Sequence, residues 1–207
     1  GGLNDLNPKD INLLNCKSRF DLWIQFINLI SGSSIAEIGV FRGDFASEVL
    51  KNCSSINSYY MIDPWRELED WNKPLNIDNR IFEECYLESL ERTKFAENRR
   101  IILRGKTTEV IHRIENESLD LIYIDGDHTL KGISIDLLNS YSKVKDGGWI
   151  GGDDFCVSIW QHNENYEPTL IFPFAIYFAE ATGSHIYALP FNQFLIKKDI
   201  INKDFKF

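Results

Sequence analysis

The sequence predicts an α/β fold in which a seven-stranded, mainly parallel sheet carries helices on both faces. Short apolar segments alternate with segments of helical periodicity along the chain, which is typical of a doubly wound sheet. Two acid-rich segments, IDGDH at 124–128 and GGDD at 151–154, flank one helix-length crossover. The last two strands are separated only by residues 190–193, so they require an antiparallel hairpin. A parallel sheet closed by such a hairpin differs from the plain dinucleotide-binding fold.

The first part of the chain predicts a helix followed by a β-α-β unit. Residues 19–30, RFDLWIQFINLI, place apolar side chains at helical spacing and end before a Ser-Gly pair. A short apolar strand at 34–39 follows, then a helix at 45–52 and a strand at 58–63. This order opens a doubly wound sheet.

Residues 64–98 interrupt the alternation. A polar, tryptophan-bearing loop at 65–74 precedes an expected helix at 80–95. Long connections of this kind are often functional loops in compact domains. We therefore interpret 64–98 as a lid-like insertion that covers a site or contacts the substrate.

The rest of the chain returns to strands and helices in turn. The expected strands are at 101–103, 119–124, 149–150, 186–189 and 194–197, and the expected helices are at 108–114, 130–144 and 171–181. Crossovers of helix length join parallel strands, so only the terminal hairpin is expected to be antiparallel.

Length and charge limit the class of protein. With 207 residues the chain is expected to form one domain, 1–207, with residues 1–32 as an N-terminal helical extension. A formal charge of −9, from 31 acidic and 22 basic residues, would repel nucleic acid. No membrane-length apolar segment or export signal is visible, so we expect a cytoplasmic protein without membrane partners. The four cysteines form no C-x-x-C pair and are expected to be reduced.

The two acid-rich segments should emerge side by side. Carboxyl ends of neighbouring parallel strands meet at one edge of a sheet, where open α/β sheets bind their ligands. Several carboxylates beside a histidine suit a divalent cation held by hard oxygen ligands, with a proton acceptor nearby. Isolated aspartates are more often caps at strand-to-helix turns, so this alternative stays open.

Residues after the first two strands suit a nucleotide-containing ligand. Gly39 and Gly43, in the turn EIGVFRG, would let the backbone approach a ligand and leave a helix amino end free. Asp63 ends the second strand, where a carboxylate can accept hydrogen bonds from ribose hydroxyls. A purely structural turn is the alternative for the two glycines. Asp-Pro is also a common turn, so a purely structural role is the alternative for Asp63.

These segments and the final hairpin resemble the class I S-adenosylmethionine-dependent methyltransferases over about residues 30–200. The IDGDH segment followed by GGDD is further similar to the metal-dependent sugar and macrolide-glycoside O-methyltransferases, the macrocin O-methyltransferase-like enzymes. The resemblance implies a Rossmann-like class I methyltransferase fold. It also implies S-adenosylmethionine as methyl donor, S-adenosylhomocysteine as product, and Mg²⁺ or a similar divalent cation.

By position in the family's motifs, the resemblance assigns cofactor contacts to residues at or just after the ends of the first four strands. They are Glu37, Gly39, Val40, Gly43, Asp63, Trp65, Gly105, Thr107 and Asp125. Asp63 would bind the ribose, and Trp65 would stack near the adenine. Phe41 stands where many relatives carry a glycine, so the turn is expected to be bulkier.

The resemblance also implies Asp125, Asp153 and Asp154 as metal ligands. Three carboxylates brought together would repel and take up protons unless a cation keeps them ionised. Because neighbouring strand residues point to opposite faces, Asp153 and Asp154 can share an ion only if the chain turns there, which the preceding glycine pair would permit. His128, three residues after Asp125, would act as general base, although lone histidines are more often structural or exposed.

The resemblance therefore implies metal-assisted methyl transfer to an oxygen of a small hydroxylated molecule, such as a sugar or glycoside. The first helix, the lid-like insertion and the loop at 160–166 would recognise this acceptor. A nicotinamide-dependent oxidoreductase stays open as an alternative, although no G-x-G-x-x-G follows the first strand. A non-catalytic cofactor-binding protein is the other alternative, and homo-oligomerisation is left open.

Overall fold

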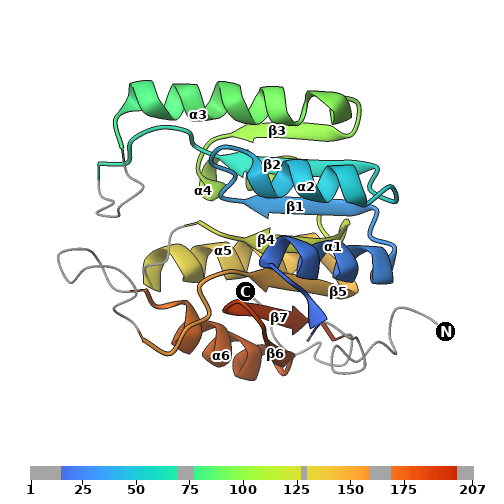
Figure 1. Cartoon of the computed structure of the whole chain (residues 1–207). Coiled ribbons are helices and arrows are strands. Elements are labelled where there is room, and N and C mark those ends of the chain that lie inside the picture. Colours follow the sequence, from blue (N-terminus) through green and yellow to red (C-terminus); the bar gives the residue numbers. More distant parts are fainter. Residues whose placement is uncertain (1–14, 70–76, 127–129, 159–168, 200–207) are drawn as a thin grey trace.

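The computed structural model of the chain describes residues 15–69, 77–126, 130–158 and 169–199. These residues form one seven-stranded sheet in the order β3-β2-β1-β4-β5-β7-β6, with helices on both faces (Figure 1). β7 runs antiparallel to its two neighbours, β5 and β6, and the other pairings are parallel. The predicted fold class is confirmed.

The strands lie close to their predicted positions. They are β1 (Ser34–Ile38), β2 (Ser58–Asp63), β3 (Arg100–Arg104), β4 (Leu119–Ile124), β5 (Val144–Gly152), β6 (His185–Leu189) and β7 (Gln193–Lys197). β5 is longer than predicted, because Val144 also pairs with β4, across a register irregularity that precedes Trp149. Such an irregularity breaks the apolar pattern by which a strand is recognised in a sequence.

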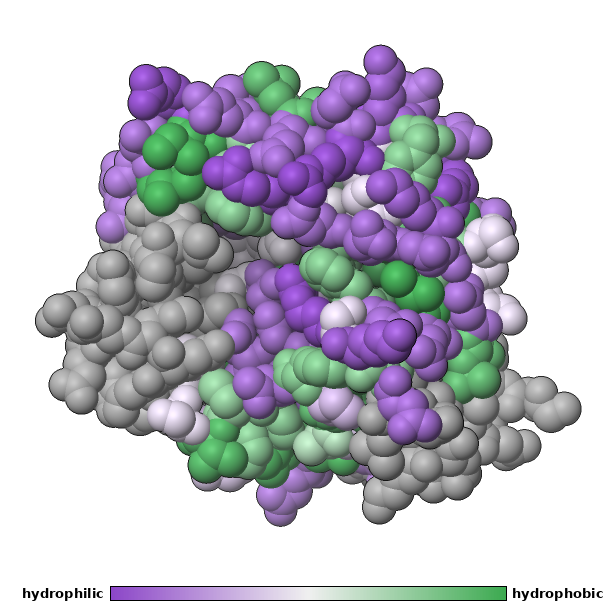
Figure 2. All heavy atoms as spheres, viewed as in Figure 1, coloured by the Kyte–Doolittle hydropathy of each residue, from purple (hydrophilic) through white to green (hydrophobic). Residues whose placement is uncertain are grey.

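The helices form two layers, one on each face of the sheet. One apolar core includes residues of α1 (Arg19–Ile30), α2 (Asp44–Asn52) and α3 (Asn79–Arg92), and the other includes residues of α4 (Thr107–Val110), α5 (Leu130–Lys143) and α6 (Ile171–Thr182). Short 3₁₀ turns at Lys94–Ala96 and Ile111–Arg113 complete the helices predicted at 80–95 and 108–114. In Figure 2 the surface over α3, at the top of the view, is mainly hydrophilic, as expected for a helix with one buried face.

α1 packs on the sheet through its apolar face. The hydroxyl of Ser18 accepts a hydrogen bond from the backbone N–H of Asp21 at 3.1 Å and begins the helix. Ser31, in the left-handed conformation with φ 50°, ends it. The buried side chains between them are Leu22, Trp23, Phe26, Ile27 and Ile30. The part of the predicted N-terminal extension that the structure describes is therefore integral to the core.

Trp23 fixes the position of α1 on the sheet. A Cβ atom on Gly151 of β5 would lie 2.2 Å from Cη2 of Trp23, so the indole packs where only glycine leaves room. The indole Nε1 also donates a hydrogen bond to Oε1 of Gln193, at 2.8 Å. α1 is thus tied to both β5 and β7.

The four cysteines form no disulfide bond in the structure. All four cysteines are free thiols, as predicted; three are buried and Cys156 is partly exposed. Within the described ranges, no helix is both long and apolar enough to cross a bilayer.

We expect Gly151→Ala to destabilise the fold by at least about 2 kcal/mol, because the new methyl group would overlap the Trp23 ring. The double variant with Trp23→Phe should lose less stability than the two single variants together, since the smaller ring vacates this space. Urea unfolding of the single and double variants measures both effects. Strictly additive losses would show that the two residues do not compete for the same space.

Candidate functional site

The ends of β1, β2, β4 and β5 lie along one edge of the sheet (Figure 1). Backbone pairing continues one residue past the strands. The N–H of Asp125 donates to the carbonyl of Ile38 at 2.7 Å, and the N–H of Asp153 donates to the carbonyl of Ile124 at 3.1 Å. The parallel register therefore places Asp125 and Asp153 next to each other.

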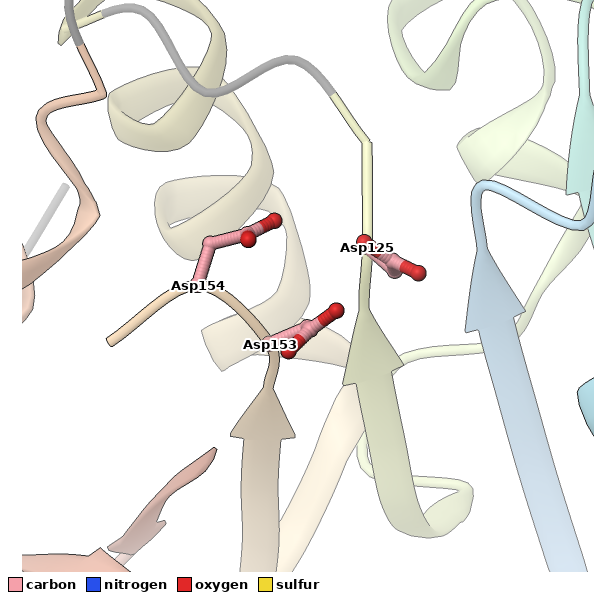
Figure 3. A group of neighbouring side chains, drawn as sticks. All are labelled: Asp125, Asp153 and Asp154. Atoms are coloured by element: carbon pink, nitrogen blue, oxygen red, sulfur yellow. The ribbon is translucent and has the colours of Figure 1, made fainter. Parts of the chain in front are cut away.

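The three predicted metal ligands converge at this edge. One carboxylate oxygen from each of Asp125, Asp153 and Asp154 lies within 4.8 Å of the other two. Figure 3 shows Asp125 after β4 and the other two side chains in the segment that follows β5. Oxygens that share one magnesium ion each lie about 2.1 Å from it, and so at most about 4.2 Å apart. A small further approach would let all three bind one ion.

Asp154 makes the turn that brings two consecutive residues to the same site. Its φ is 62°, in the left-handed region that aspartate adopts more readily than most residues. The prediction that the glycine pair would provide this turn is wrong, because Gly151 and Gly152 lie within β5 and pair regularly with β7. Their missing side chains instead leave room for the rings of Trp23 and Phe194.

The cluster concentrates negative charge in a partly buried place. Burial, followed by the charges of Asp125 and Asp154, raises the pKa of Asp153 to about 6. A divalent cation would act in the opposite sense and favour the ionised carboxylate. Three hard oxygen donors of this kind fit a magnesium-like ion.

Arg19, the first residue of α1, lies beside the cluster. Its Nη1 is 3.5 Å from Oδ2 of Asp125 and 3.9 Å from Oδ2 of Asp153, and it donates to the Tyr123 hydroxyl at 2.9 Å. Burial lowers the pKa of Arg19, but Tyr123 and the two aspartates outweigh burial and raise it. This contact was not predicted. Arg19 precedes Tyr123 by 104 residues, and nothing local in the sequence signals their proximity.

Gln193, the first residue of β7, orients Asp153. Its buried Oε1 accepts hydrogen bonds from the Trp23 indole and the Tyr123 hydroxyl, each at 2.8 Å. Because an indole N–H can only donate, the amide is fixed with Nε2 toward Asp153, whose Oδ1 it meets at 2.6 Å. Gln193 was not predicted as a site residue either. The only signal was one polar residue at the start of an apolar strand.

Asp63, at the end of β2, holds the loop that follows β1. Its Oδ2 accepts the N–H groups of Val40 and Phe41, both at 2.9 Å, and its Oδ1 accepts that of Trp65 at 2.8 Å. Burial raises the pKa of Asp63, while these three hydrogen bonds lower it. The hydrogen bond from the Trp65 N–H closes a turn after Asp63, which is the structural role that we considered as the alternative. The ribose contact of Asp63 stays a prediction.

Gly39 and Gly43 both have positive φ, 90° and 82°. A Cβ on Gly39 would lie 1.9 Å from the carbonyl oxygen of Asp125, and one on Gly43 would lie 2.9 Å from Cα of Ser89. The glycines therefore let this loop pack against the end of β4 and against α3. Val40 between them is 4% exposed. Cofactor contacts from these three residues stay predictions.

Glu37 lies in the core below this loop. It is 1% exposed, and its Oε1 accepts a hydrogen bond from the Tyr59 hydroxyl at 2.7 Å. Burial raises its pKa from 4.5 to about 8, against the lowering effect of the Tyr59 hydrogen bond. Glu37 is therefore mainly neutral at pH 7, and its cofactor contact stays a prediction.

The residues predicted for the adenine side also pack around this loop. Trp65 is 1% exposed, and its Nε1 donates to the carbonyl of Phe41 at 2.7 Å. The N–H of Gly105 donates to the carbonyl of Asp63 at 3.0 Å, and the largely buried Thr107 begins α4. Their contacts with an adenine stay predictions.

His128 lies outside the described residues, as does the loop at 160–166. Its role as base stays a prediction that rests on its place in the sequence, between Asp125 and the start of α5 at Leu130.

The sequence profile of a protein family described as a methyltransferase domain matches residues 36–155, more than half of the chain. The chain therefore belongs to this family of methyltransferase domains. A sequence comparison with curated proteins gave no significant match.

Several solved structures share the fold at low sequence identity. A Staphylococcus aureus protein whose proposed activity is caffeoyl-CoA O-methyltransferase has a TM-score of 0.63 at 14% identity, over 93% of this chain and 90% of that one. The O-methyltransferase from Bacillus cereus in complex with SAH gives 0.58 at 14% identity, over 94% and 83%. TomG from Streptomyces achromogenes, an O-methyltransferase of tomaymycin synthesis in complex with SAM, gives 0.59 at 12% identity, over 95% and 82%.

We expect Glu37→Gln to flatten the dependence of stability on pH. Because the folded-state pKa of Glu37 is raised to about 8, folded protein keeps a proton that the unfolded chain releases, and stability falls as pH rises from 4.5 to 8. A pKa difference of one unit is worth about 1.4 kcal/mol. Urea unfolding in the presence of chelator is measured at about pH 6.5 and 8, both above the pKa of Asp153. The free energy of unfolding should fall less between these pH values in the variant than in the wild type. Equal losses would contradict the buried, neutral Glu37.

Proposed function

We propose that the chain is an S-adenosylmethionine-dependent methyltransferase that acts on an oxygen of a small hydroxylated acceptor. Membership of the methyltransferase-domain family supports the reaction class. The similar folds in complex with SAM or SAH support the donor. The observation that carries the proposal is the convergence of Asp125, Asp153 and Asp154 at the sheet edge where Asp63 holds the loop after β1.

A divalent cation such as Mg²⁺ is proposed at the aspartate cluster. Its three carboxylates supply the ligand type that Mg²⁺ prefers. Burial, followed by the charges of Asp125 and Asp154, raises the pKa of Asp153, and a bound cation would oppose this effect. When bound, such an ion supplies positive charge that lowers the pKa of a nearby acceptor hydroxyl.

The chain's own groups have separate tasks in this proposal. The loop after β1 binds the methionine part of the donor, and Asp63 binds its ribose. His128 takes the proton of the acceptor hydroxyl, and the oxygen attacks the methyl carbon of the sulfonium. The carbon–sulfur bond breaks as the oxygen–carbon bond forms, so the acceptor is methylated and S-adenosylhomocysteine leaves. Positioning of donor and acceptor supplies much of the acceleration, since the sulfonium already activates the methyl group.

A sugar or glycoside is the proposed acceptor class. It rests on the similarity of the IDGDH and GGDD segments to glycoside O-methyltransferases, and the charge of −9 argues against a nucleic-acid acceptor. A nicotinamide-dependent oxidoreductase is not favoured, because the family match is to methyltransferases. Calorimetry with S-adenosylmethionine and with NAD distinguishes a methyltransferase from an oxidoreductase. Methyl transfer to a panel of glycosides separates an enzyme from a non-catalytic binding protein.

We predict that Asp63→Ala weakens S-adenosylmethionine binding by at least about tenfold, because it removes the ribose acceptor and loosens the loop after β1. Asp120→Ala is the matched control. Asp120 also accepts two backbone N–H groups, from Ser33 and Ser34, but at the opposite edge of the sheet. Calorimetry measures both dissociation constants. An unchanged affinity in Asp63→Ala would refute the ribose assignment.

We predict that Asp153→Asn abolishes metal-stimulated methyl transfer while cofactor affinity stays nearly intact. Loss of one carboxylate ligand should weaken Mg²⁺ binding by at least about 100-fold. Asp146→Asn, at the exposed opposite end of β5, is the control and should behave as wild type. Turnover of a responsive glycoside is measured with Mg²⁺ and in excess chelator. Equal wild-type activity in chelator would count decisively against the metal.

A further inference from the structure

The guanidinium of Arg19 acts on the aspartate cluster by charge. Its distances to Oδ2 of Asp125 and Oδ2 of Asp153, 3.5 and 3.9 Å, exceed those of ordinary hydrogen bonds. The same Nη1 donates a hydrogen bond of 2.9 Å to the Tyr123 hydroxyl. Arg19 is therefore anchored on Tyr123 and places its positive charge beside two carboxylates.

The two oxygens of Asp153 have different neighbours. Oδ1 accepts the amide of Gln193 at 2.6 Å, whereas Oδ2 faces Arg19. Arg19 also faces Oδ2 of Asp125. A cation shared by the three aspartates would lie within a few ångströms of the guanidinium, and two positive charges at that separation repel.

The side chain of Arg19 is supported by its neighbours but stays partly exposed to solvent. Its side chain is 30% exposed. Its Cζ lies 4.9 Å from the ring centroid of Phe20 and 5.6 Å from that of Phe45. These rings support the cation beside the cluster, and the exposed side leaves it a way toward solvent.

We infer that Arg19 is the counter-cation of the aspartate cluster in the metal-free protein, and that Arg19 and a divalent cation compete for Asp125 and Asp153. The inference rests on the proposed metal site. When a divalent cation binds, it displaces the guanidinium of Arg19 from the two carboxylates. Binding therefore also loosens the contact between the start of α1 and the end of β4.

Manganese binding tests the competition. Mn²⁺ is titrated into wild type, Arg19→Met and Arg19→Lys, with binding followed by electron paramagnetic resonance and folding checked by thermal melts. Arg19→Met should bind Mn²⁺ about tenfold more tightly, because the competing charge is gone, and Arg19→Lys should stay closer to wild type. Arg92→Met is the control, since Arg92 pairs with Asp44 and Glu88 rather than with the three aspartates. Equal or weaker binding by folded Arg19→Met overturns the competition.

The wild-type titration separately tests the proposed metal. Binding by Arg19→Met but not by wild type would support the competition and remove the metal from the native mechanism. No binding by either protein would overturn both the metal site and the competition.

A double-mutant cycle in chelator tests the counter-cation without any metal. Arg19→Met should lower the free energy of unfolding of the wild-type protein. The same substitution should lower it much less in the Asp153→Asn variant, where one of the repelling carboxylates is gone. Urea midpoints measure this coupling. Additive losses would overturn the assignment of Arg19 as counter-cation, and a coupling would support it whatever the manganese result.

Discussion

Mutual repulsion among three carboxylates at one edge of the sheet is the constraint on which this site depends. Parallel pairing of β4 with β5 brings Asp125 beside Asp153, and the turn at Asp154 adds the third. The protein opposes this repulsion with the charge of Arg19 and with the amide of Gln193. In the proposed function, a magnesium-like cation would complete the balance, because it offers more charge than one guanidinium.

The elements outside the parallel strands build much of the site. α1, which precedes the sheet, supplies Arg19, and β7, which closes it, supplies Gln193. Trp23 joins the two, since its indole donates to Gln193 and occupies the space that Gly151 leaves. Packing of α1 and orientation of Asp153, a proposed metal ligand, therefore depend on the same contacts.

Local patterns were sufficient to predict the fold and part of the site. Alternating apolar and helical segments report which residues are buried, and parallel register alone placed Asp125 next to Asp153. The positions of the Arg19 guanidinium and the Gln193 amide depend instead on contacts between segments far apart in the chain. Trp23 and Gln193 are 170 residues apart, and neither segment signals the other. The glycine pair in β5 was misinterpreted for the same reason, because the rings that pack against it, Trp23 on α1 and Phe194 on β7, belong to segments distant in the sequence.

A crystal structure with S-adenosylhomocysteine and Mn²⁺, phased to show the anomalous signal of manganese, tests the central claim most directly. One manganese ion should be bound by carboxylate oxygens of Asp125, Asp153 and Asp154, next to the sulfur of the bound cofactor. The account would be contradicted by S-adenosylhomocysteine in its pocket while the aspartates hold no ion and remain paired with Arg19.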